Sequence, residues 1–100
     1  MSQQLIDDVG TLLDHRRSTL ERAIAARHLA DGDAPDIVET LLRIAQDEHE
    51  EEWVSHAAGE SLAEILFRRG HVETAPLHDF TGAAYIGFDE GVAQLQRQRL

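Results

Sequence analysis

The stretch VSHAAGESLAEI, residues 54–65, decides the fold of this chain. Its apolar and small residues recur every three or four positions, which is the spacing of one face of an α-helix. A basic last turn follows and ends at Gly70, as is typical of a helix C-terminus. The stretch therefore predicts an amphipathic helix, and its buried face is expected to consist of Val54, Ala57, Ala58, Ser61, Leu62 and Ile65.

Helical spacing recurs along most of the remaining chain, and no alternating strand pattern competes with it. The second expected helix places Leu20, Ile24 and Leu29 near one face, which we expect to be buried. The last expected helix is the least regular, because it contains three glycines that each cost about 1 kcal/mol relative to alanine. The pattern predicts an all-α fold with further helices at about 3–14, 18–30, 35–47 and 81–98.

An internal repeat relates two of these helices. ERAIAARHLA, which starts at Glu21, aligns with VSHAAGESLA, which starts 33 residues later, so that Ala25 matches Ala58 and Leu29 matches Leu62. Each copy follows an amphipathic helix that contains a leucine pair. This arrangement predicts two stacked helical hairpins, whose small inner residues allow the helices to approach closely.

Residues 53–65, WVSHAAGESLAEI, resemble the second helix of a HEAT-type repeat, which typically opens with Val-Arg and continues with paired alanines and a leucine. The resemblance covers about residues 3–69. It departs from the pattern at Glu21, where an aliphatic residue is usual, and at Ser55, where an arginine is usual. The resemblance implies one domain, residues 1–100, built as a short right-handed α-solenoid of two HEAT-like hairpins with a C-terminal capping helix.

Composition limits the classes of partner. Nineteen acidic residues and nine arginines give a net charge of −10, which repels nucleic acids and anionic membranes and favours a basic protein partner. The absence of cysteine excludes disulfides and thiolate metal sites. Since the N-terminal sequence lacks the pattern of a secretory signal and no apolar run approaches about 18 residues, we expect a cytoplasmic protein.

A metal or catalytic site is weakly indicated at the start of the central helix. His49, Glu52 and His56 lie on one helical stripe and could hold a metal ion, but they lack the spacing of zinc hydrolases. The alternative is a solvated acidic helix start, which the helix dipole favours. We prefer that alternative and expect no catalytic residue, no metal and no cofactor, although carboxylates that folding brings together stay open at this point.

Negative charge is concentrated between residues 31 and 52, where nine acidic residues and one arginine give a net charge of −8. Such a run is either a set of solvated turns or a docking surface for a basic protein. Trp53 follows the run and is either a core residue or an interface anchor. The candidate partner-binding residues are Asp31, Asp33, Asp36, Asp47, Glu48, Glu51, Glu52 and Trp53.

These features favour contact rather than chemistry as the function. Small acidic HEAT-like proteins without catalytic residues resemble bacterial immunity proteins, which bind and neutralise a cognate toxin, often a basic nuclease. The sequence alternative is an adaptor or regulatory subunit of another bacterial complex, and a third is a HEAT-like lyase related to the phycobilin lyases. The oligomeric state is not indicated by any feature of the sequence.

Overall fold

The computed structural model describes residues 2–32 and 34–99, and all regular structure within these ranges is helical. The predicted all-α class is confirmed, and the helices lie close to their expected bounds. Three 3-10 turns, Leu29–Asp31, Val72–Thr74 and Leu77–Asp79, occur between helices. The α-helices are α1 (Gln3–Leu13), α2 (Thr19–His28), α3 (Pro35–Gln46), α4 (Glu52–Arg69) and α5 (Gly82–Gln98).

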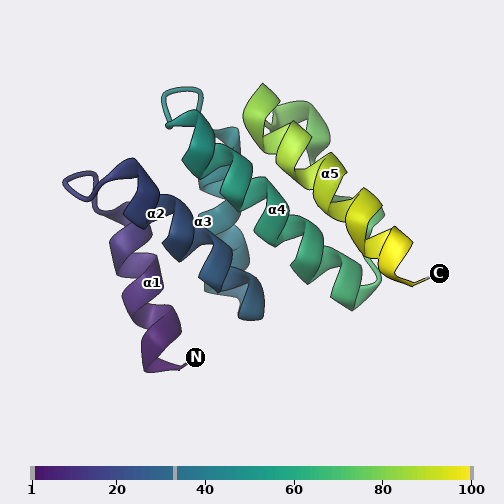
Figure 1. Ribbon diagram of the computed structural model, residues 1–100, viewed down its shortest axis with the longest axis horizontal. Coiled ribbons are helices and arrows are strands. Elements are labelled where there is room, and N and C mark those ends of the chain that lie inside the picture. The colour runs from purple at the N-terminus through teal and green to yellow at the C-terminus, as the bar shows by residue number, and fades with distance from the viewer. Residues whose placement is uncertain (1, 33, 100) are drawn as a thin grey trace.

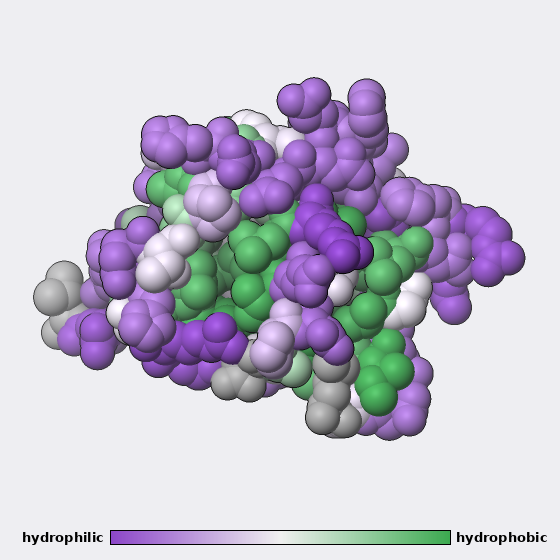
Figure 2. Space-filling view, turned by 180° about the vertical axis from the view of Figure 1, so that it is seen from behind, coloured by the Kyte–Doolittle hydropathy of each residue, from purple (hydrophilic) through white to green (hydrophobic). Residues whose placement is uncertain are grey.

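Helices α2, α4 and α5 lie side by side and run in the same direction, while α3 runs back behind them and α1 runs back beside α2 at the edge of the row (Figure 1). The segment between α4 and α5 returns along the rear, where the Thr81 N–H donates to the Ala45 carbonyl at 2.8 Å. Seen from behind, hydrophobic side chains gather in patches separated by hydrophilic ones (Figure 2). No helix in the described part of the chain is both long and apolar enough to span a membrane.

The turns of the two hairpins, residues 14–18 and 47–51, are related by the predicted 33-residue repeat. Asp14 Oδ1 accepts a hydrogen bond from the backbone N–H two residues later at 3.0 Å, and Asp47 Oδ1 does the same at 2.9 Å. Both aspartates also follow the last residue of a helix. The repeat therefore extends from the helix faces to the hydrogen bonding of the turns.

A buried ion pair fixes the second turn to the first hairpin. Arg22 donates from its two terminal nitrogens to the two carboxylate oxygens of Glu50 at 2.8 and 2.7 Å, and from Nε to the Leu12 carbonyl at 2.8 Å. Their side chains are 3% and 1% exposed. Burial raises the pKa of Glu50, but the hydrogen bonds from Arg22 and the Glu51 N–H together outweigh it and hold the pKa below its ordinary value.

The buried face predicted for α4 is confirmed, since Val54, Ala58, Leu62 and Ile65 are each 0% exposed. The face predicted for α2 is wrong in part. Leu29 is buried, but Leu20 is 58% exposed and Ile24 is 45% exposed. The residues that α2 buries are Arg22, Ala25 and Ala26. Small residues let α2 approach α4 closely, so its larger apolar side chains project from the other side.

The contact between α4 and α5 depends on glycine in both helices. A Cβ atom on Gly59 would overlap the carbonyl oxygen of Ala84, and a Cβ atom on Gly87 would overlap the carbonyl oxygen of His56. Each glycine therefore admits the backbone of the other helix. The helical cost of these glycines is offset by the close packing that they permit.

We expect Gly59→Ala to destabilise the protein by about 1–3 kcal/mol through overpacking, although alanine is the better helix former. Gly10→Ala is the matched control, because Gly10 lies within α1 and an added Cβ would meet nothing within 4 Å. This control should stabilise by about 0.5–1 kcal/mol. Urea unfolding of both variants measures the difference, and equal effects would contradict the close approach of α5.

Arg22→Met should lower the free energy of unfolding near neutral pH by about 3–5 kcal/mol, because it leaves the Glu50 carboxylate buried without its cation. In the wild type, the contribution of Glu50 is present above the unfolded pKa of about 4.3 and is lost as the pH falls through the lower folded pKa. The difference between variant and wild type should therefore shrink in acid.

Arg43→Met is the control for that experiment, since Arg43 and Glu39 form an exposed pair at 2.8 Å. An exposed pair within one helix contributes about 0.3–0.5 kcal/mol, and we expect the control to change stability by no more than this. Urea unfolding of all three proteins across a pH series provides the measurement. A loss in Arg22→Met that matches the control, or that does not vary with pH, would contradict the role of the ion pair.

Candidate binding groove

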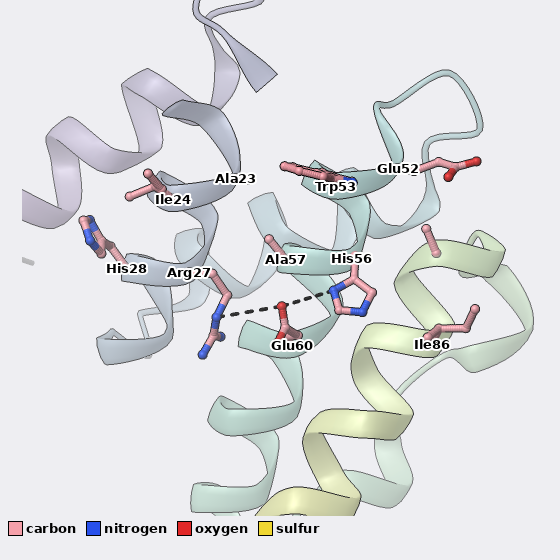
Figure 3. A pocket seen from close by; sticks show the side chains of 11 residues that line it. Ala23, Ile24, Arg27, His28, Glu52, Trp53, His56, Ala57, Glu60 and Ile86 are labelled. Atoms are coloured by element: carbon pink, nitrogen blue, oxygen red, sulfur yellow. Dashed lines mark hydrogen bonds and ion pairs between the residues drawn. The ribbon is translucent and has the colours of Figure 1, made fainter. Parts of the chain in front are cut away.

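A groove of about 680 Å³ opens on the face that α2, α4 and α5 share (Figure 3). Its volume lies within the range of small-molecule and cofactor pockets, which are typically lined by apolar side chains and a few polar groups. The groove has this composition. Its apolar residues are Ala23, Ile24, Trp53, Ala57, Ala83 and Ile86, and its polar residues are Arg27, His28, Glu52, His56 and Glu60.

Three large apolar side chains, one from each helix, form the walls of the groove. Ile24 is 45% exposed, Trp53 is 69% exposed and Ile86 is 50% exposed. Figure 3 shows the Trp53 ring extending from the start of α4 toward α2, above the small side chain of Ala57. The other apolar lining residues are the alanines Ala23, Ala57 and Ala83, so the apolar walls are large side chains standing on closely packed helices.

A chain of polar side chains crosses the groove from α2 to α5. Arg27 lies 4.0 Å from a carboxylate oxygen of Glu60 and 3.7 Å from one of Glu64. His56 Nδ1 lies 3.1 Å from the same Glu60 oxygen, and His56 Nε2 lies 3.9 Å from Glu90. The one arginine that lines the groove is therefore already shared between two carboxylates, and the groove carries excess negative charge.

The turn before α4, residues 47–51, continues the groove at the N-terminal end of that helix. Glu50, Glu51, Glu52 and Trp53 line a second hollow of about 600 Å³, together with Thr19 of α2. The ring of Trp53 thus stands between the two hollows. Glu51 and Glu52 are exposed, whereas the Glu50 side chain is buried against Arg22.

The structure divides the predicted partner-binding residues into two groups. Glu51, Glu52 and Trp53 lie together at the groove, with Glu48 exposed on the adjoining turn. Asp47 belongs to the same turn, but its Oδ1 accepts the His49 N–H and so stabilises the turn.

The second group lies at the opposite end of α3. Asp31 and Asp36 are both exposed there, and Asp33 lies outside the described residues. Because α3 has 12 residues, about 18 Å of helix separates the two groups. The acidic run is therefore not one continuous surface.

Burial decides between the two interpretations of Trp53 that the sequence left open. Trp53 is too exposed to be a core residue, so the core interpretation is wrong. The stripe of His49, Glu52 and His56 forms no metal-binding group, since no three potential ligands converge anywhere in the described ranges 2–32 and 34–99.

Most groove residues were not predicted from the sequence as site residues. Ile24 was assigned to the core, His56 was considered only as a metal ligand, and Ile86, Arg27 and Glu60 were assigned no role. One signal was present for α2: its small residues and its large apolar residues lie on different faces, and both faces cannot pack against α4. Comparison with protein-family models, with curated proteins and with solved structures found no match to this chain.

We expect Ile24→Ala to change the free energy of unfolding by no more than about 0.5 kcal/mol, because the side chain stands on the surface. Leu29→Ala, which truncates a fully buried leucine in the 3-10 turn directly after the same helix, should cost about 2–5 kcal/mol. Chemical unfolding of the two variants provides the comparison. If Ile24→Ala were the more destabilising variant, α2 would present its other face to the core.

Proposed function

We propose that this chain is a non-catalytic protein-binding module and that it acts as an immunity protein, neutralising a basic bacterial toxin by covering it. The observation that carries the proposal is the exposed Trp53 ring beside Glu51 and Glu52 at the edge of an apolar groove. A desolvated aromatic residue bordered by charged residues is the usual form of an interface hot spot. The proposal places the protein in the cytoplasm.

The charge at this edge supports a basic partner. Glu50 is neutralised by Arg22, but Glu48, Glu51 and Glu52 take part in no ion pair within the described ranges. Together with a net charge of −10, these carboxylates would attract a cationic surface and accelerate its encounter with the groove. Binding alone would then mask the partner, without any chemical step.

The proposal also includes the finer architecture that the repeat implies. The two hairpins would form a short right-handed α-solenoid of HEAT type, with α2 and α4 as equivalent second helices and α5 as the cap. The 33-residue recurrence of the helix ends and of the turn hydrogen bonds supports this interpretation. In such an array, α2, α4 and α5 together present one continuous binding face.

Affinity capture from the source organism should recover a basic protein, and binding kinetics against that protein test the proposal. Replacing Glu48, Glu51 and Glu52 with glutamine should slow association and flatten its dependence on salt, because exposed charges act mainly on the encounter. Trp53→Ala should instead accelerate dissociation, by about tenfold or more, because it removes a desolvated anchor.

The matched control replaces Asp31 and Asp36 with asparagine and Glu39 with glutamine, which removes the same charge from residues that do not line the groove. Its association rate should stay near that of the wild type. If association slowed equally in both triple variants, the cause would be the net charge of the protein and not the position of the carboxylates. Association and dissociation rates that change neither with salt nor with any substitution at the groove would overturn the proposed surface.

A further inference from the structure

We infer that the groove between α2, α4 and α5 receives a basic amphipathic α-helix of the partner protein. Its aliphatic stripe would contact Ile24, Trp53 and Ile86, and its lysines or arginines would face Glu51 and Glu52. This inference rests on the proposed function and adds the secondary structure and the side-chain pattern by which the partner is recognised.

The helical surface excludes strand addition as the mode of recognition. Strand addition needs an exposed sheet edge, but the groove is walled by three helices whose backbone groups are bonded within each helix. Recognition must therefore use side chains. An amphipathic helix presents apolar side chains at i, i+3, i+4 and i+7 to such a groove, and this pattern is the established mode of helix-in-groove binding.

The dimensions of the groove agree with about two turns of a partner helix. Along α4 the lining residues Trp53, His56 and Glu60 follow one another at i, i+3 and i+7. Seven residues of helix rise about 10 Å, which is close to two turns. Ile24 and Ile86 stand on the helices to either side of this line, so both flanks of an apolar stripe would find an aliphatic contact.

Charge complementarity selects a basic helix over an acidic one and over a second copy of this chain. Arg27 lies within 4.0 Å of carboxylate oxygens of Glu60 and Glu64, and these negative charges oppose the approach of an acidic ligand. Glu51 and Glu52 are exposed carboxylates without an ion pair among the described residues, and covering them without a cation would cost desolvation energy. A second copy carries a net charge of −10 and would bring further carboxylates to the same place.

The test uses Trp53, which is the single tryptophan of the chain, as the reporter. The probe is a peptide of about 14 residues with leucines at helical spacing, lysines elsewhere and no aromatic residue. Docking should shift the Trp53 emission to the blue and saturate. A peptide of the same composition with its leucines scrambled around the helix, and a peptide with glutamate in place of lysine, should each bind about tenfold more weakly or not at all.

Two wall variants test where the peptide lies. Ile24→Ser and Ile86→Ser should each weaken binding by about fivefold or more, through the loss of apolar contact. Ile6→Ser is the matched control, because Ile6 is 49% exposed on α1 and does not line the groove. Thermal unfolding of each variant checks that it folds. Because Ile24 and Ile86 lie on different helices, the two variants test the location of the peptide independently.

Equal binding of the scrambled peptide, or unchanged binding to both wall variants, would overturn helix docking. A blue shift that grows with the concentration of the chain alone, together with a dimer in sedimentation, would assign the groove to a second copy and overturn it also. The proposed function is tested separately. If association of the recovered partner depends on Glu48, Glu51 and Glu52, the proposed function is retained, even when the peptide and the wall variants contradict helix docking.

Discussion

Helix α4 contacts α2, α3 and α5, and the rest of the structure depends on how closely these neighbours can approach it. Close approach requires small side chains at the contacts. Helix α4 buries leucine and isoleucine, and it also buries six small residues. These are Ser55, Ala57, Ala58, Gly59, Ser61 and Ala63. Small residues occupy many of these contacts, and the large side chains of Ile24 on α2 and Ile86 on α5 stand outside them, exposed. The groove is thus a consequence of the packing around α4.

Polar groups hold the same layer together where alanine and glycine provide little contact area. The Ser61 hydroxyl donates to the Ala26 carbonyl at 2.6 Å, and Arg27 donates to the Ser61 oxygen at 3.1 Å. Arg22 and Glu50 then fix the turn that carries Glu51 and Glu52. Removing either charge of this pair would leave the other buried and unpaired, which is strongly destabilising. The pair holds Trp53 and its acidic neighbours at one edge of the groove.

The sequence predicted the helices well because each has its own period, its own cap or its own terminal glycine. It also predicted the buried face of α4, where one apolar face is clear. For α2 the helical period was insufficient to identify the buried face. Leu20 and Ile24 form one stripe, and Ala25 and Ala26 belong to another. Packing against α4 decides which of the two is buried. The Arg22–Glu50 pair and the groove join residues from distant parts of the chain, and no local pattern indicates such contacts.

The central claim is that the face shared by α2, α4 and α5 is the surface by which this protein binds its partner. Hydroxyl-radical footprinting of the side chains, with and without the recovered partner, tests the claim most directly. We predict that the partner protects Trp53, Ile24 and Ile86 from oxidation, while Ile6 and Leu13 of α1 react equally in both states. Unchanged oxidation of Trp53 together with protection on α1 would contradict the claim and assign binding to another face.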